Sequence, residues 1–199
     1  MRPLLEAEHR VSTPELWQEG SLVDIVLDAI PGESAALVGA SFGGGGALEA
    51  AAAAPERVEA LVLINSNPFG WSDDVTAIMR EEDALAEAGR LDDAAALMVR
   101  AWLVGARREE VEVPRELRDL VFAMERRAYE LPQPGRGQFE LDDVRAPILY
   151  IRGELDWPDV ERASKRFPNA RHAVIEGVAH LPALERPAEV ARLVQEFIA

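Results

Sequence analysis

The sequence predicts an α/β protein built on a mainly parallel sheet of about four strands, and three observations lead to this class. Short apolar runs alternate with segments of helical character, which is the order of elements in a parallel sheet. The runs are almost continuously apolar, as expected for strands that helices cover on both faces. Polar residues that could carry chemistry follow three of the runs, at Ser41, Asp156 and His180. Ligands of such sheets bind beyond the carboxyl ends of the strands.

The N-terminal part of the chain predicts two helices and two strands. Thr13-Pro14-Glu15 has the pattern of a helix start, because a capping residue precedes a proline, and this helix should end near Pro31-Gly32. The apolar run 35–39 predicts a strand that enters a glycine-rich turn, and the alanine-rich stretch 47–54 predicts a helix. Residues 58–64 predict the second strand.

The middle of the chain differs in character from both ends. Residues 71–138 lack strand-like runs, and their apolar residues recur at helical spacing. We expect a helical insertion there, between core segments 1–70 and 139–199. The arginine pairs Arg107-Arg108 and Arg126-Arg127 are expected on solvated helix faces.

The predicted elements after the insertion are two strands, the helix between them and a closing helix. Residues 147–152 and 173–176 predict the strands, and apolar residues at helical spacing connect them. Residues 190–197 have the pattern of an amphipathic helix that closes the fold.

Composition restricts the classes of partner. The chain has 199 residues, with 21 basic and 36 acidic side chains and a formal net charge of −15. Nucleic acid and anionic membranes are not expected partners, because binding them needs clustered Lys and Arg. The absence of cysteine excludes disulfides and thiolate metal sites and fits a cytoplasmic protein. We expect neither a signal peptide nor a membrane span, since no apolar run approaches roughly 18 residues.

The segment Gly39-Ala40-Ser41-Phe42-Gly43 has the G-x-S-x-G pattern of a nucleophile elbow, between a predicted strand and a predicted helix. Such a turn strains the serine backbone, so the glycines two residues before and two after it should let strand and helix approach closely. Ser41 is therefore the candidate nucleophile, and the N–H of Phe42 is the candidate oxyanion donor at the helix N-terminus. A glycine-rich helix entry with an idle serine is the alternative interpretation.

A serine nucleophile needs a base, and the chain has three histidines. His180 follows the last predicted strand, in a loop that Pro182 should stiffen, and is the candidate base. His9 lies in an unpatterned stretch, and His172 stands at the start of a predicted strand.

The acid that orients the histidine should also follow a strand. Asp156 is preferred to Glu154 and Asp159, although spacing does not decide between them. The order Ser41, Asp156, His180 is the nucleophile, acid, base order of one class of serine hydrolase.

These motifs make the sequence similar to the α/β-hydrolase superfamily, especially its bacterial esterase, lactonase and carbon–carbon-bond hydrolase branches. The resemblance runs from about Thr13 to the end of the chain. It is carried by the elbow segment 36–44, the helix end and next strand at 54–63, the acid strand 147–156 and the histidine loop 177–187.

The resemblance implies a serine hydrolase that cleaves a small ester or related carbonyl compound through an acyl-enzyme, with no metal or organic cofactor. It also implies that residues 71–138 form a cap over the substrate pocket.

Aromatic residues beside a sheet more often belong to the core than to a pocket. With that alternative open, the candidate pocket residues are Phe42, Trp71, Trp102, Trp157 and Leu181.

One part of the family pattern has no counterpart before Thr13. This part is the N-terminal half-sheet, including a strand that ends in His-Gly and whose loop donates the second oxyanion N–H. We therefore expect a partial sheet with the elbow strand at its edge, where it could pair with a second copy in a homodimer. Activity should also be impaired, since one missing oxyanion donor typically costs about 10²–10³ in rate.

Two other functional interpretations stay open. The chain could be a catalytically weak or inactive hydrolase remnant that acts as a binding module. It could instead be a short-chain dehydrogenase whose glycine-rich turn holds NAD(P). Against the dehydrogenase, neither Tyr129 nor Tyr150 begins a Tyr-x-x-x-Lys pair, and the second strand ends in Asn65 instead of a ribose-binding acid.

Overall fold

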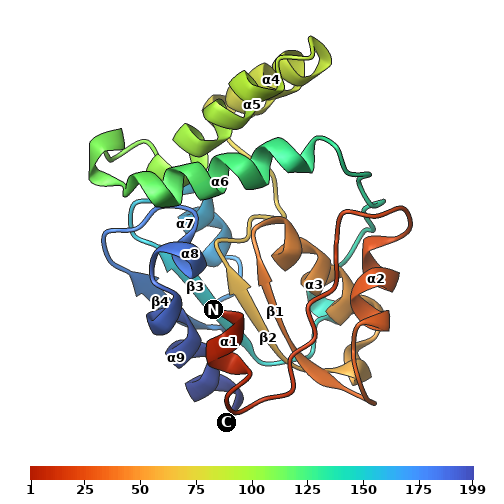
Figure 1. The fold of residues 1–199 in the computed structure, drawn as a ribbon. Helices are drawn as coiled ribbons and strands as arrows, with labels where there is room; N and C mark the ends of the chain where they lie inside the picture. Colours follow the sequence, from red (N-terminus) through yellow and green to blue (C-terminus); the bar gives the residue numbers. More distant parts are fainter.

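Four parallel strands form the sheet, in the spatial order β1-β2-β3-β4 (Figure 1). The computed structural model describes residues 1–199, and its strands are β1 (Ala35–Ala40), β2 (Val58–Ile64), β3 (Ile148–Gly153) and β4 (Arg171–Ile175). The predicted fold class and the partial, parallel sheet are therefore confirmed. β1 pairs only with β2, so the strand that leads to Ser41 lies at the edge of the sheet. Pairing of this edge with a second copy stays a prediction.

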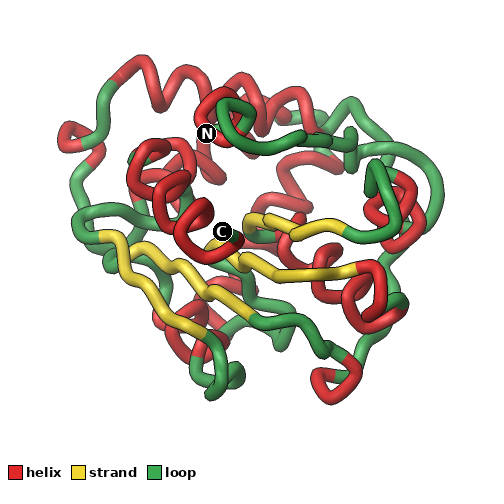
Figure 2. Tube along the Cα trace, turned by 90° about the horizontal axis from the view of Figure 1, so that it is seen from below, coloured by secondary structure: helices red, strands yellow, loops and turns green.

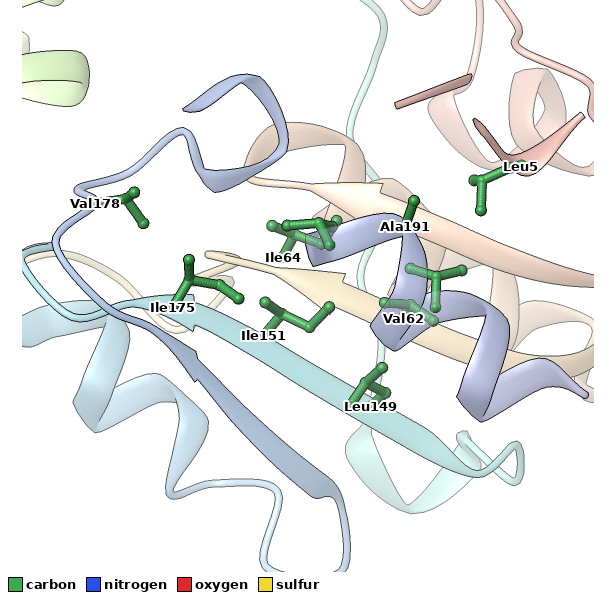
Figure 3. Packing of buried hydrophobic residues seen from close by; sticks show 10 residues of the cluster. Leu5, Val62, Ile64, Leu149, Ile151, Ile175, Val178 and Ala191 are labelled. Atoms are coloured by element: carbon green, nitrogen blue, oxygen red, sulfur yellow. The ribbon is translucent and has the colours of Figure 1, made fainter. Parts of the chain in front are cut away.

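Helices lie on both faces of the sheet, which explains why β1, β2 and β3 are mostly apolar (Figure 2). Alternate residues of each strand point to opposite faces. On one face, sheet residues such as Val62 and Ile151 pack against α9 and α1 in a buried cluster (Figure 3). On the other face, Leu61 and Tyr150 pack against α3 and α7. The α-helices are α1 (Arg2–Leu5), α2 (Leu22–Asp28), α3 (Phe42–Ala53), α4 (Asp73–Glu87), α5 (Leu91–Met98), α6 (Arg115–Ala128), α7 (Pro158–Ser164), α8 (Pro182–Glu185) and α9 (Pro187–Ile198).

The chain between β2 and β3 is helical, and the division of residues 71–138 from the core as a cap stays a prediction. This part of the chain contains α4, α5, a π-helical segment η2 (Val99–Val104) and α6. Figure 1 shows α6 crossing over one end of the molecule, with α4 and α5 projecting beyond it. The insertion contacts the loop after β4, because the His180 N–H donates to the Trp102 carbonyl at 3.1 Å. Short 3-10 turns complete the fold: η1 (Pro55–Arg57), η3 (Glu110–Glu112) and η4 (Leu141–Asp143).

The N-terminal segment corrects one predicted boundary. The helix expected to begin at Thr13 begins only at Leu22. Gly20 has a φ of 123°, which interrupts the helical pattern. Backbone hydrogen bonds from Gly135 N–H to the Gly20 carbonyl (2.8 Å) and from Leu22 N–H to the Gly135 carbonyl (2.9 Å) hold the chain there. These tertiary contacts outweigh the local start signal.

No helix of the protein is both long and apolar enough to cross a bilayer.

The glycine-rich turn between β1 and α3 is strained, as predicted, since Ser41 has φ 46° and ψ −114°. A Cβ atom on Gly39 would lie 2.4 Å from the Gly43 carbonyl oxygen, so this position requires glycine. The expectation for Gly43 is wrong, because a Cβ there would make only an ordinary 3.4 Å contact with Leu16. The second tight position is Gly44, where a Cβ would lie 1.8 Å from the Ser66 hydroxyl oxygen.

Replacing the elbow glycines tests this packing. We expect Gly39→Ala to lower the free energy of unfolding by about 1–3 kcal/mol, because the methyl group would overlap backbone atoms. Gly43→Ala is the matched control and should leave stability unchanged or raise it slightly, since alanine favours a helix. Urea denaturation measures both variants. Equal stability of the two variants would contradict the account.

Candidate active site

Three side chains from separate loops form a chain of hydrogen bonds beyond the carboxyl ends of the strands. His180 Nε2 lies 2.9 Å from Ser41 Oγ. His180 Nδ1 lies 2.9 Å and 3.0 Å from the two carboxylate oxygens of Asp156. The histidine and the aspartate are only 4% and 6% exposed. Both contacts are satisfied together when Nδ1–H donates to the carboxylate and Nε2 accepts from the serine hydroxyl.

The elbow presents Ser41 toward this chain at the start of α3. The Ser41 N–H donates to the Ile64 carbonyl at 2.8 Å, which fixes the turn against β2. Phe42 is the first residue of α3, so its N–H has no partner within the helix and lies at the positive end of the helix dipole. The turn therefore combines an exposed hydroxyl with a helix terminus suited to an anionic oxygen.

The other histidines and acids considered in the sequence have separate contacts. His172 lies on β4, with Nε2 3.1 Å from the Phe167 carbonyl oxygen. Glu154 accepts a hydrogen bond from the Gly177 N–H at 3.0 Å, and Asp159 accepts from the N–H and hydroxyl of Ser72 at 2.6 Å and 3.0 Å. The structure therefore brings Asp156, and neither alternative acid, to the imidazole.

Asn65 holds the histidine loop in place, a role that no motif of the sequence predicts. Its side chain is fully buried at the end of β2. The amide Nδ2 donates to the Ala179 carbonyl at 2.9 Å, and Oδ1 accepts from the Gly153 N–H at 2.8 Å. One side chain thus links the ends of β2 and β3 to the residue before His180. A polar residue at the end of an apolar strand was the only available signal.

A buried ion pair anchors the same loop from the other side. Arg108 Nη1 lies 2.6 Å from Glu185 Oε2, with both side chains less than 10% exposed. Arg108 also donates to the Gly177 carbonyl at 3.1 Å, and Glu185 accepts from the Ala179 N–H at 3.3 Å. The expected solvated position of the Arg107-Arg108 pair is therefore wrong for Arg108. Its charge is buried because a carboxylate and several carbonyl oxygens satisfy its donors.

A cavity of about 1280 Å³ lies beside the serine and the histidine. Its walls include four of the expected pocket residues, namely Phe42, Trp71, Trp102 and Leu181. The ring of Trp102 lies 4.6 Å from that of His180, measured between centroids, and 5.4 Å from that of Trp71. Their role in binding substrate stays a prediction.

Trp157 does not line this cavity, in contrast to the expectation. Its indole N–H donates to the Ala101 carbonyl at 3.0 Å, and its backbone N–H donates to the Asp156 carboxylate at 2.8 Å. The residue thus joins the acid loop to the insertion and helps to position the carboxylate.

Two glutamates of the insertion also line the cavity, Glu82 on α4 and Glu125 on α6. The pKa of Glu125 is raised to about 7, mainly by burial and also by the charge of Glu82, while His180 acts in the opposite direction. Burial also raises the pKa of Glu82, although a 2.7 Å hydrogen bond from the Tyr129 hydroxyl acts in the opposite direction. Both glutamates therefore line the same cavity as the imidazole.

Asn65→Asp tests the anchor of the histidine loop. The variant keeps the acceptor for Gly153 but places a carboxylate oxygen against the Ala179 carbonyl. We expect a loss of about 1–3 kcal/mol in the free energy of unfolding, because a buried acceptor then lacks its donor. Asn67→Asp is the matched control, since the Asn67 amide makes a similar 2.7 Å bond to Gly70 in an exposed loop. If both variants lose the same stability in chemical denaturation, Asn65 is not the anchor.

Glu125→Gln tests the raised pKa. The pKa of this carboxyl is near its ordinary value of 4.5 in the unfolded chain and about 7 in the folded protein, so ionisation destabilises the fold as the pH rises between these values. We expect the variant to be more stable than the wild type at pH 8, by on the order of 2 kcal/mol, and equally stable at pH 4. Glu116→Gln, on an exposed position of the same helix, should show no such dependence. A gain independent of pH would contradict the raised pKa.

Comparisons with known proteins place this geometry in a family. Residues 9–193 match the model of the alpha/beta hydrolase family. No curated protein matches the sequence.

Several solved structures of esterases share the fold. A carboxylesterase structure from Nitrososphaera gargenis has a TM-score of 0.65 at 18% identity, with 89% of this chain and 71% of that one covered. An esterase of Thermogutta terrifontis gives 0.64 at 17% identity, with 95% and 74% covered. The carboxylesterase CesB of Bacillus subtilis gives 0.62 at 24% identity, with 96% and 70% covered. The fold and the family match agree, and the chain belongs to the alpha/beta hydrolase family.

Proposed function

We propose that the protein is a serine hydrolase that cleaves an ester or a related carbonyl compound through an acyl-enzyme. The observation that carries the proposal is the hydrogen-bonded chain from Ser41 through His180 to Asp156, with donor–acceptor distances of 2.9 Å at both links. The adjoining cavity offers room for a small-molecule substrate. Membership of the alpha/beta hydrolase family supports the same conclusion.

In the first half of the reaction, Ser41 Oγ attacks the carbonyl carbon while His180 Nε2 takes the hydroxyl proton. The carbonyl oxygen becomes an oxyanion, for which the N–H of Phe42 is the nearest donor at the start of α3. The carbon–oxygen bond to the alcohol then breaks, and the imidazolium gives its proton to the leaving oxygen. Asp156 holds the imidazole in the required tautomer and stabilises its positive charge.

In the second half, a water molecule attacks the acyl-enzyme. His180 takes one proton of the water, the bond between the acyl carbon and Ser41 Oγ breaks, and the proton returns to the serine. The carboxylic acid leaves and the resting state is restored. This cycle uses no cofactor, so no NAD(P) is needed. The contact between Ser41 and His180 favours a nucleophilic serine over the dehydrogenase interpretation of the same turn.

A binding module with weak hydrolysis is the second candidate, and one observation favours it. All six residues of β1 (Ala35–Ala40) line the same cavity as Ser41. The cavity therefore extends along the open edge of the sheet, where β1 has no second neighbouring strand to supply a further oxyanion donor. Loss of one oxyanion donor typically costs about 10²–10³ in rate, so we expect slow turnover relative to the rate of covalent labelling.

A fluorophosphonate probe tests the proposed nucleophile. We expect the wild type to form one covalent adduct, with loss of fluoride, and Ser41→Ala to form none. Asp156→Asn should slow labelling by several orders of magnitude, because the imidazole loses its orienting carboxylate. Intact-mass spectrometry measures the adduct.

Ser12→Ala is the control for this experiment. Ser12 lines the same cavity but lies outside the hydrogen-bonded chain, so this variant should label like the wild type. A folded wild type that stays unlabelled would overturn the proposal. Rapid labelling with negligible ester turnover would support the second candidate.

A further inference from the structure

The cavity wall contributed by the insertion is acidic, and the mechanism above does not use its charges. Glu82 and Glu125 come from different helices, α4 and α6, and line the same cavity as Ser41 and His180. Glu82 accepts a hydrogen bond from the Tyr129 hydroxyl at 2.7 Å. Glu125 forms no ion pair or side-chain hydrogen bond within the protein, and it is partly buried. Two carboxyl groups therefore share one wall without a cation.

Three arginines line the cavity, and none of them forms an ion pair with Glu82 or Glu125; Arg10 is exposed and forms no ion pair. Arg136 pairs with the buried Glu49 at 2.6 Å and lies over the ring of Phe42. Arg2 pairs with Glu6 at 2.8 Å. Neither glutamate of the wall therefore has an ion-pair partner within the protein, and a cationic group of a bound ligand would provide one.

Aromatic rings line the same cavity next to the imidazole. Trp102 packs on His180 at 4.6 Å between ring centroids, and Trp71 lies 6.1 Å from the same ring. Indole faces attract ammonium groups, most strongly where water is excluded. Since His180 gives its proton to the leaving alcohol, the side of the cavity next to His180 receives the alcohol part of the substrate. The aromatic rings therefore lie on the alcohol side of the cavity, and the two glutamates line the same cavity.

We propose that this wall selects esters whose alcohol part carries an ammonium group, with Glu125 and Glu82 supplying the charge and Trp102 and Trp71 the aromatic contacts. Selectivity in ester hydrolysis rests on the proposed function of the protein as a serine hydrolase. The recognition of the cationic alcohol itself does not require turnover. Glu125 and Glu82 are specificity residues in this scheme, since they contact the alcohol group and not the reacting bond.

Binding of two alcohols of equal shape tests the recognition directly. Choline carries a quaternary ammonium group, and 3,3-dimethylbutan-1-ol replaces its nitrogen by carbon. We expect Ser41→Ala, which cannot turn over, to bind choline about tenfold more tightly than the neutral alcohol. NMR titration of the indole N–H signals measures both affinities. Equal affinities, or tighter binding of the neutral alcohol, would overturn the proposal.

Variants that replace one glutamate by glutamine then show which residues cause the preference for choline. Glu125→Gln and Glu82→Gln should each reduce the ratio of choline to neutral affinity several-fold, since one carboxylate is lost from the wall. Glu116→Gln removes the same charge from an exposed position of α6 and should leave the ratio unchanged. A ratio that falls equally in all three variants would indicate a general charge effect and contradict a specific wall.

Ester hydrolysis separates this inference from the proposed function. The butyrate esters of the two alcohols should differ in kcat/KM in the same direction as the affinities. A choline preference in binding without hydrolysis of either ester would contradict the proposed function and support the recognition site. Hydrolysis of both esters with equal kcat/KM would support the hydrolase and overturn the selectivity.

Discussion

The position of the loop that carries His180 determines the rest of the site. An imidazole can serve Ser41 and Asp156 together only if its ring plane and both nitrogen atoms are held within a few tenths of an ångström. Buried polar contacts on two sides hold the loop: the Asn65 amide at the end of β2, and the ion pair of Arg108 with Glu185. These groups have lost their hydration, so displacing the loop would leave them unsatisfied.

The same constraint couples the insertion to the sheet. The carbonyl of Trp102 accepts the His180 N–H, while the indole of Trp102 packs on the imidazole and lines the cavity. Arg108 follows in the same segment and reaches the histidine loop. One stretch of the insertion therefore shapes the cavity and positions His180, so changes in the insertion should alter both the cavity and the geometry of the imidazole.

Much of this arrangement could be predicted from the sequence because it depends on local patterns. The apolar run 58–64 gave the bounds of β2, and the elbow glycines together with the strand ends located Ser41, Asp156 and His180. Contacts between distant residues gave no such pattern. Asn65 and Arg108 looked like a strand end and a surface charge, since their partners lie 114 and 77 residues away.

The central claim is that His180 is held as the Nδ1–H tautomer, with Asp156 as its acceptor and Ser41 as its donor. Nitrogen NMR of protein labelled with ¹⁵N-histidine reports the protonation of each ring nitrogen directly. The account predicts a protonated Nδ1 and an unprotonated Nε2 for His180 in the resting protein at pH 8, with this pattern lost in Asp156→Asn. Finding the proton on Nε2 in the wild type would contradict it.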